Sequence, residues 1–228
     1  MLLFFQPDIA TQPFLDPIDS KHCIKVLRRV VGDEIWVTDG KGNMYQCIIS
    51  DASHKSTKVE IKEHYPEYQK QNRRVKIAIA PTKNTDRIEY FVEKGVEIGV
   101  SEIYFIETQN SERRVLKTDR IERIAISAMK QSLKAYLPTI HVMIPFSSLI
   151  GSSLPGQKLI AHLSDVAVSI TDLPIKEEVL VMIGPEGDFT NDEIAIAKEN
   201  GFQEIKMGTS RLRTETAGVV ALSMLNLL

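Results

Sequence analysis

Ile183-Gly184-Pro185-Glu186-Gly187-Asp188 is one of two stretches from which the fold of this chain can be read. The other is Met207-Gly208-Thr209-Ser210-Arg211-Leu212-Arg213-Thr214-Glu215-Thr216-Ala217-Gly218. Each follows a short apolar run typical of a buried strand and precedes a helical pattern. Two such turns at the carboxyl edge of a parallel sheet form a crevice lined with free backbone N–H groups. We therefore expect the ligand site there.

The sequence around these turns alternates between strand and helix patterns. Continuous apolar runs predict strands at Val75–Ala80, Glu102–Ile106, Lys158–Leu163, Val179–Ile183 and Glu204–Met207. Helical periodicity predicts helices at 86–98, Arg120–Lys134, Asn191–Asn200 and Thr214–Leu227. This alternation predicts an α/β fold with a parallel sheet that helices cover on both faces.

The first seventy residues have a different, β-rich pattern. Ile35–Thr38 leads through the turn Asp39-Gly40-Lys41-Gly42 into Met44–Ile49, and Lys58–Lys62 alternates polar and apolar residues. Short strands joined by glycine turns indicate a small barrel, and Ser20 is expected to cap a short helix ahead of them. The polar segment 65–73 is typical of a linker. We expect a small β-barrel domain over 1–70 and an α/β domain over 74–228.

Composition excludes several classes of protein. The chain has 228 residues, is 43% hydrophobic and carries a net charge of −2, which does not fit a surface covered in basic residues. No apolar run reaches the roughly 18–20 residues of a membrane span. Two separated cysteines and no export signal predict reduced thiols and a cytoplasmic location. The scattered histidines predict no metal site.

The residue types in the two turns point to a ligand, but not to a common nucleotide. Gly184 and Gly187 permit tight backbone geometry, and a capped βα turn does not explain Glu186 between them. The fingerprints GxGxxG and GxxxxGK[ST] are absent, so neither NAD nor ATP is supported. Arg211 and Arg213 suit phosphate or carboxylate recognition. Alternatively, Arg213 and Glu215 form an internal salt bridge that braces the loop.

A basic stripe runs from Gln109 to Lys134. It has seven basic residues against three acidic ones, a net of +4. Such a stripe can bind phosphates within a mildly acidic protein. The same pattern is also typical of a solvated helix face with i,i+3 and i,i+4 pairs, and the stripe alone favours this second interpretation.

Six motifs in order along the chain resemble the ribosomal RNA small subunit methyltransferase E family, within the knotted SPOUT superfamily. The matching pieces are Gly184–Gly187, Met207-Gly208 with Leu212–Ala217, Glu93–Val100, Ser111–Arg113, Gln131-Ser132 with Pro138, and early residues from His22 to Gly40. Three positions depart from the family pattern. Asp188 stands where a second glycine is usual, Lys130 where glutamate is common, and Lys134 where arginine is common.

The resemblance implies a PUA-like β-barrel for RNA, followed by an α/β domain with a deep trefoil knot. It implies a homodimer, S-adenosyl-L-methionine as cofactor, and methylation at N3 of a uridine in 16S rRNA, with the assembled small subunit as the expected partner. Three knot loops would hold the cofactor, and the residues that we expect to bind it are His162, Leu163, Ile183, Gly184, Glu186, Gly187, Met207, Gly208, Leu212, Thr214 and Thr216. His162 is interpreted as a strand-end residue without a catalytic role.

The chemistry assigns further roles. Uridine N3 carries a proton and needs a base, or positive charge beside the uracil oxygens, before it can attack a methyl group. We expect Arg213 to supply that charge and Glu215 to orient Arg213 or, second, to accept the proton. The expected RNA contacts are Arg28, Arg29, Arg113, Arg114, Gln131, Ser132 and Lys134, with Lys130 adding charge. Two other hypotheses remain: a SPOUT methyltransferase with another RNA target, and an RNA-binding protein without catalysis.

Overall fold

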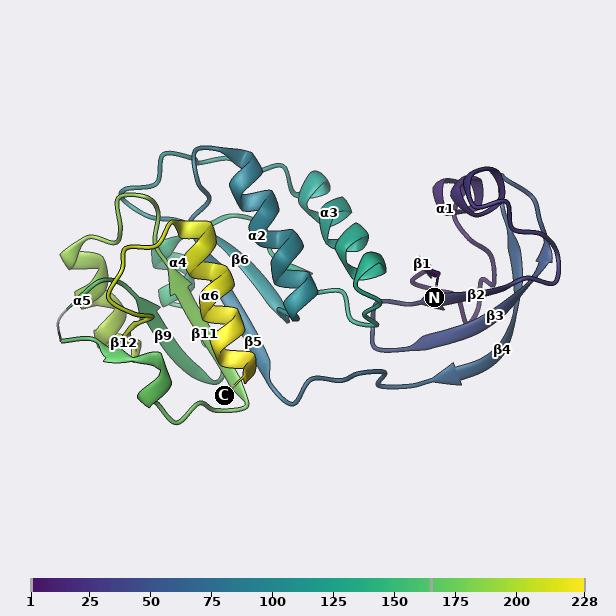
Figure 1. Cartoon of the computed structure of the whole chain (residues 1–228). Helices are drawn as coiled ribbons and strands as arrows, with labels where there is room; N and C mark the ends of the chain where they lie inside the picture. The colour runs from purple at the N-terminus through teal and green to yellow at the C-terminus, as the bar shows by residue number, and fades with distance from the viewer. Residues whose placement is uncertain (1, 165, 228) are drawn as a thin grey trace. The chain divides into compact units, whose positions relative to one another are not determined.

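The computed structural model describes residues 2–164 and 166–227, and its backbone forms two compact units (Figure 1). The N-terminal unit comprises Met1–Lys70 and Ile126–Leu137, and the C-terminal unit comprises Gln71–Ala125 and Pro138–Leu228. The predicted division assigned 126–137 to the C-terminal domain. That segment instead joins the N-terminal unit because it forms backbone hydrogen bonds there: the Gly42 N–H donates to the Ala135 carbonyl (2.9 Å), and the Leu137 N–H donates to the Gly40 carbonyl (2.9 Å).

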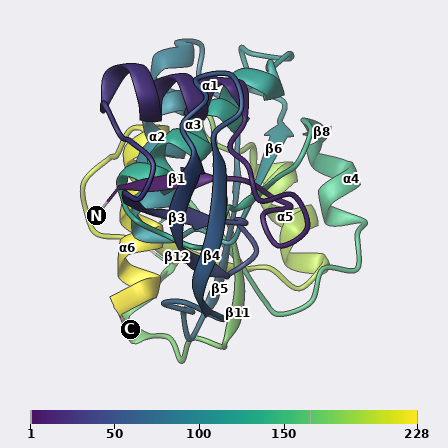
Figure 2. The ribbon, with the colours of Figure 1, turned by 90° about the vertical axis from the view of Figure 1, so that its right-hand side faces the viewer.

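The N-terminal unit is built on one four-stranded sheet, which faces the viewer in Figure 2. Its strands, in spatial order, are β1 (Leu3–Phe5), β2 (Glu34–Thr38), β3 (Met44–Asp51) and β4 (Lys58–Tyr65). β1 runs parallel to β2, and the other pairs are antiparallel. Alternate residues of the strands, including Ile35, Val37 and Cys47, point into a fully buried core.

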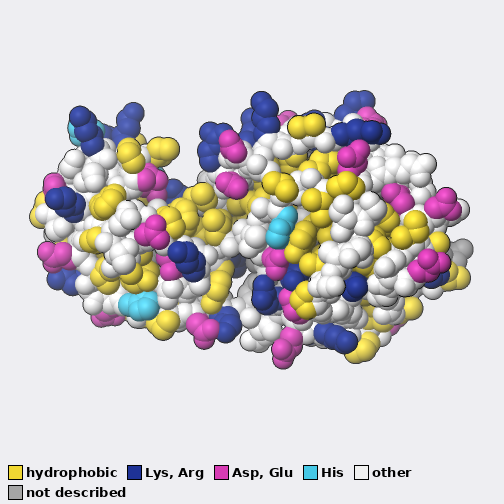
Figure 3. Space-filling view, turned by 180° about the vertical axis from the view of Figure 1, so that it is seen from behind, with side chains coloured by type: hydrophobic (Ala, Val, Ile, Leu, Met, Phe, Trp, Pro, Cys, Tyr) yellow, Lys and Arg dark blue, Asp and Glu magenta, His cyan; other side chains and the backbone are white. Residues whose placement is uncertain are grey.

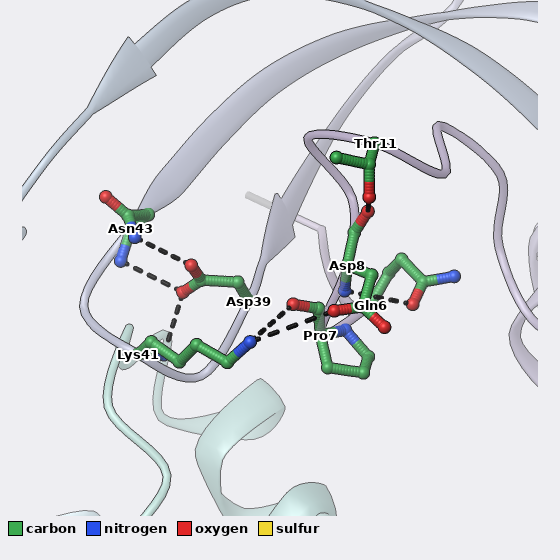
Figure 4. Close-up of polar contacts among 7 residues, drawn as sticks. All are labelled: Gln6, Pro7, Asp8, Thr11, Asp39, Lys41 and Asn43. Atoms are coloured by element: carbon green, nitrogen blue, oxygen red, sulfur yellow. Dashed lines mark hydrogen bonds and ion pairs between the residues drawn. The ribbon is translucent and has the colours of Figure 1, made fainter.

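The turn between β2 and β3 is held by the carboxylate of Asp39 (Figure 4). One oxygen, Oδ1, accepts the N–H groups of Lys41 (2.7 Å) and Asn43 (3.1 Å), while Oδ2 accepts the Asn43 side-chain amide (2.6 Å). Gly40 has φ +72°, and a Cβ there would lie 2.9 Å from the Phe5 ring. The predicted turn is therefore present, and it requires both the aspartate and the glycine.

The short helix ahead of this sheet begins earlier than predicted. Helix α1 spans Pro17–Lys21 and continues as the π-helical turn η1 (His22–Val26). Its cap is Asp16, whose Oδ1 accepts the Asp19 N–H at 2.7 Å. The expected cap, Ser20, lies inside the helix, where its buried hydroxyl donates to the Leu15 carbonyl (3.0 Å) and accepts the Thr57 N–H (2.8 Å). Pro17 explains the shift, because proline is favoured in the first helical turn.

The C-terminal unit contains a parallel sheet in the order β10-β12-β9-β11-β5-β6-β7, with β8 also paired to β6. All its described strand pairs are parallel, as the alternating pattern predicted. The strands are β5 (Arg74–Ile79), β6 (Glu102–Glu107), β7 (Thr139–Ile140), β8 (Ile144–Pro145), β9 (Gln157–Ala161), β10 (Val168–Ser169), β11 (Glu178–Ile183) and β12 (Gln203–Lys206).

Helices cover both faces of this sheet (Figure 1). Helices α2 (Thr85–Ile98) and α6 (Thr214–Leu227) pack on each other, and α6 packs on β5 and β11. Side chains of α4 (Phe146–Ile150) and α5 (Asn191–Glu199) bury Tyr104, Ile160 and Met182 on the opposite face. Helix α3 (Thr118–Gln131) ends three residues before its predicted end at Lys134, and its last residues belong to the N-terminal unit.

Gly218 sets the distance between α6 and α2. A Cβ at this position would lie 2.6 Å from the Phe91 ring, well inside van der Waals contact. Gly218→Ala is therefore expected to destabilise the protein by about 1–3 kcal/mol through overpacking. Replacement of glycine by alanine inside a helix usually raises stability, so the loss expected here is the opposite of the usual effect. Denaturant unfolding monitored by circular dichroism measures the change.

Gly95 in α2 provides the matched control. A Cβ there would meet Val100 Cγ1 at 3.4 Å, which is ordinary contact. Gly95→Ala should therefore be neutral or stabilising by up to about 1 kcal/mol. If both variants change the free energy of unfolding equally, close packing of α6 on α2 is not the reason why glycine is needed at position 218.

Candidate functional site

A cavity of about 340 Å³ opens at the carboxyl ends of three adjacent strands. Strands β9, β11 and β12 end at Ala161, Ile183 and Lys206, and each of these residues lines the cavity. β9 lies between the other two strands, so the chain after each strand meets the other two loops at one edge of the sheet. The volume is within the usual range for a small-molecule site. The two turns predicted to hold a ligand do line one cavity.

Hydrogen bonds join the two long loops of the cavity. The Thr214 hydroxyl donates to the Gly184 carbonyl at 3.0 Å, and Arg211 donates from Nη2 to the Glu186 carbonyl at 2.9 Å. The carboxylate of Glu186 accepts the Lys83 N–H through Oε1 (3.2 Å), while its Oε2 is buried without a hydrogen-bond partner in the described part of the chain. The loops are therefore preformed, and one buried carboxylate oxygen in the cavity wall lacks a donor.

Asp188 adopts the backbone conformation that a glycine would. Its φ is +62°, in the left-handed region that L-residues rarely enter, although aspartate does so more readily than most. The Asp188 N–H closes a turn by donating to the Pro185 carbonyl (3.0 Å), and its Oδ1 accepts the Phe189 N–H (2.8 Å). The first departure from the family pattern thus keeps the glycine-type turn and stabilises it with a local side-chain bond.

Asp188→Ala is expected to destabilise the protein by about 1 kcal/mol, because alanine bears the left-handed strain without the compensating hydrogen bond. Asp188→Gly should be close to neutral, since glycine enters this region freely. Thermal unfolding of the three proteins tests the order. Equal melting temperatures for the alanine and glycine variants would contradict this explanation of the turn.

Nine of the eleven predicted cofactor residues line the cavity. They are His162, Leu163, Ile183, Gly184, Glu186, Met207, Gly208, Leu212 and Thr214. Gly187 and Thr216 are not among its lining residues. Gly187 instead gives its carbonyl to the Asn110 amide (3.2 Å), and Thr216 lies within the first turn of α6. A loop motif does not show which of its residues turn away from the cavity, and cofactor binding by these two residues stays a prediction.

Other lining residues were not selected from the sequence. They are Ala161, Pro185, Asp188, Lys206, Ser210, Arg211 and Ala217. Arg211 was noticed only for its charge, and its place in the sequence between Met207-Gly208 and Leu212–Ala217 was the available signal. Lys206, at the end of β12, gave no motif signal.

Arg213 and Glu215 are separated by the start of α6. Arg213 lines the cavity and is exposed, whereas Glu215 is 7% exposed and does not line it. The ion partner of Glu215 is Arg87 of α2, with 3.8 Å between Arg87 Nε and Glu215 Oε1. Among the described residues Arg213 has no ion pair, so Glu215 does not hold Arg213 through a salt bridge, and the orienting role of Glu215 stays a prediction. Successive residues at a helix start point to different sides, which explains the separation.

Two of the predicted RNA contacts have local partners in the C-terminal unit. Arg113 donates from Nε to the Thr82 carbonyl (3.0 Å) and from Nη2 to the Lys83 carbonyl, so it braces the chain after β5. Arg114 Nε lies 3.4 Å from Glu107 Oε1 and stays 72% exposed. Arg114 therefore remains accessible to a phosphate, whereas Arg113 has its guanidinium engaged by backbone carbonyls.

The remaining predicted RNA contacts belong to the N-terminal unit. Arg28 and Gln131 are exposed, and the Ser132 hydroxyl donates to the Ala128 carbonyl at 2.7 Å. Lys130 does not add free positive charge as predicted, because its Nζ lies 2.7 Å from Asp19 Oδ1, and Asp19 is 3% exposed. The other members of the group, Arg29 and Lys134, are half-buried. Figure 3 shows basic side chains interleaved with acidic ones on the face that it displays.

No cluster of three or more metal-ligating side chains is present in residues 2–164 and 166–227. Over the same residues, no helix is long and apolar enough to cross a bilayer.

Comparison with known proteins identifies what kind of protein has this fold and cavity. The protein-family model of the RNA methyltransferase domain matches residues 69–226. The protein-family model of the RNA methyltransferase PUA domain matches residues 15–62. These matches define the class: an RNA methyltransferase domain preceded by a PUA domain. A ribosomal RNA small subunit methyltransferase E from Mesomycoplasma hyopneumoniae (strain 232) is 31% identical over 175 residues, which are 74% of this chain and 76% of the relative. The chain belongs to the ribosomal RNA small subunit methyltransferase E family.

Two solved structures are similar over the whole chain. A probable rRNA-methyltransferase from Porphyromonas gingivalis is 42% identical, with a TM-score of 0.93, and the match covers 100% of this chain and 98% of that one. A ribosomal RNA small subunit methyltransferase E from Neisseria gonorrhoeae, bound to S-adenosyl methionine, is 26% identical with a TM-score of 0.90, covering 100% and 97%.

Proposed function

We propose that this chain is an S-adenosylmethionine-dependent methyltransferase that modifies N3 of one uridine in 16S rRNA. The observation that carries the proposal is the three-loop cavity, in which nine residues expected from the family motifs meet at one sheet edge. Family membership supports ribosomal RNA as the substrate class. The position on the base and the 16S target are inferred from the resemblance.

The lining residues fit the cofactor. Apolar walls from Ile183 and Leu212 can take a nucleoside, and the open space beside Gly208, where φ is +129°, leaves its backbone accessible to a ligand. The buried, unpartnered Glu186 Oε2 can accept a hydrogen bond or face positive charge. When bound, S-adenosylmethionine supplies an electrophilic methyl group that needs little further activation.

Arg213 is the residue that we assign to the base. It lines the cavity, is exposed and has no ion pair in the described part of the chain, so its guanidinium is available for a uracil oxygen. Positive charge there stabilises the uridinate that forms when N3 loses its proton. Glu215, paired with Arg87, fixes the start of α6 and so keeps Arg213 at the cavity.

Further expectations accompany this function. We propose that the C-terminal unit carries the deep trefoil knot of its superfamily, although true knots are rare, and that the enzyme acts as a homodimer. RNA contacts are assigned to Arg28, Arg29, Arg114, Gln131, Ser132 and Lys134, with the N-terminal unit as the RNA-binding domain and the assembled small subunit in the cytoplasm as the substrate.

The test is mass spectrometry of 16S rRNA from a strain that lacks this gene. Loss of one N3-methyluridine, and its return when purified protein and S-adenosylmethionine act on the small subunit, is the expected result. Loss of a methyl group from a different RNA would support a methyltransferase with another target. If the protein binds RNA but calorimetry detects no S-adenosylmethionine binding, the enzyme assignment fails.

A further inference from the structure

His162 is the cavity residue whose surroundings are most closely defined. It follows β9, and its backbone N–H donates to the Ile205 carbonyl of β12 at 3.2 Å. Its ring atom Nε2 lies 2.8 Å from Glu204 Oε2, and the two side chains are 8% and 14% exposed. Both the backbone and the ring of His162 are thus tied to one neighbouring strand.

Glu204 is held in turn by a residue of α5. Lys198 forms an ion pair with Glu204 Oε1, the oxygen that His162 does not use. This ion pair, and the hydrogen bond with His162, keep the pKa of Glu204 below its ordinary value despite its burial. Glu204 is therefore an ionised acceptor at neutral pH, and both of its oxygens are engaged.

An ionised acceptor on Nε2 decides which ring nitrogen carries the proton. A carboxylate can only accept, so Nε2 must be the donor, and in the neutral imidazole Nδ1 is then left with a lone pair. No described residue hydrogen-bonds to Nδ1, and His162 lines the cavity whereas Glu204 does not. Nδ1 of His162 is therefore a hydrogen-bond acceptor that is held in a fixed orientation at the cavity.

We propose that Glu204, clamped by Lys198, is a positioning residue that fixes the tautomer and orientation of His162, whose Nδ1 accepts a hydrogen bond from a hydroxyl or amino group of the bound cofactor. The inference rests on the proposed cofactor site. A carboxylate that accepts a hydrogen bond from one ring nitrogen sets the histidine tautomer in the same way at many metal and catalytic sites. Here the arrangement serves ligand binding.

Nuclear magnetic resonance of the ligand-free full chain, labelled with ¹⁵N-histidine, tests the tautomer directly. His162 should be the Nε2–H tautomer in the natural protein. Glu204→Gln should shift it toward Nδ1–H, because a glutamine amide can donate to Nε2. An Nδ1–H tautomer in the natural protein, or no change in the variant, overturns the proposal. This readout does not depend on whether the protein binds a cofactor or transfers a methyl group.

Calorimetry with S-adenosylhomocysteine tests the consequence. Glu204→Gln and His162→Phe should each weaken binding by about tenfold, a loss of about 1.4 kcal/mol. The double variant should lose no more than either single one, because the two residues act through one contact. Additive losses in the double variant would contradict the proposal.

Two controls separate the possible explanations. Glu199→Gln, an exposed neighbour on α5, should change neither the tautomer nor the affinity. Methylthioadenosine, which keeps the adenosine part but lacks the amino acid part, locates the donor: an equal loss with both ligands indicates a ribose hydroxyl or the adenine amino group, and a loss only with S-adenosylhomocysteine indicates the amino group of the amino acid part. If the natural protein binds neither ligand, the proposed function fails while the tautomer result stands.

Discussion

Replacement of Lys76 by methionine is expected to lower the free energy of unfolding by about 3–5 kcal/mol. Lys76 lies in the middle of the parallel sheet and is 3% exposed. Its Nζ lies 2.7 Å from Glu178 Oε1 and 3.3 Å from Glu102 Oε1. Removing the ammonium leaves the carboxylates of Glu102 and Glu178 close together in a mostly buried environment without their shared cation. An uncompensated negative charge in such a place lowers the stability of the folded state.

Lys158 is the matched control for this substitution. Both lysines lie in register with Leu180, on the strands that flank β11. Lys158 is half-buried and, among the described residues, donates only to the Asn200 carbonyl (3.2 Å), so Lys158→Met should cost less than about 1 kcal/mol. Adding Glu178→Gln to Lys76→Met should restore part of the loss. Urea unfolding of the four proteins measures these differences, and equal losses for the two lysines would refute the charge argument.

The same cluster predicts how stability depends on pH. Burial by itself raises the pKa of Glu102, but hydrogen bonds from Tyr104 and His141, together with Lys76, hold that pKa below its ordinary value of 4.5. A lowered folded pKa means that Glu102 contributes stability above the unfolded value and loses it as the pH falls through the folded value. The acid side of the stability curve should therefore flatten in Lys76→Met.

Arg213→Ala is expected to lower kcat by about 10²–10³-fold, because it removes the charge assigned to the uracil oxygens as N3 loses its proton. Binding of S-adenosylhomocysteine and the melting temperature should stay close to those of the natural protein, since Arg213 is exposed and makes no ion pair in the described residues. Arg213→Lys should recover part of the rate, as lysine keeps the charge but not the fork. Single-turnover transfer to small subunits measures the chemical step.

Arg211→Ala is the informative comparison. Arg211 ties its loop to the Glu186 carbonyl at 2.9 Å, so its loss should raise the KM for the cofactor more than it lowers kcat. If Arg213→Ala shows this KM effect and Arg211→Ala the kcat effect, the roles assigned to the two arginines are reversed.

Most of the fold was predictable because local patterns and tertiary packing agree. The continuous apolar runs at β5, β9 and β11 fit strands that are buried on both faces, and the helices that end at Gly99 and near Gly201 show their stop signals. Helix ends were less predictable. Ser20 and Asp16 are both good caps, and only the packing of Ser20 against Thr57 decides between them.

The sequence by itself determined the parallel sheet, the two turns and the residues that could hold a ligand, since these depend on periodicity and on residue types at short spacing. The tertiary structure alone decided the partners of charged side chains. It pairs Glu215 with Arg87 instead of Arg213, joins Lys130 to Asp19, and places Glu204 behind His162. Each pair joins residues that are distant along the chain. The attraction between two charges depends on their distance in space, and no local sequence pattern records that distance.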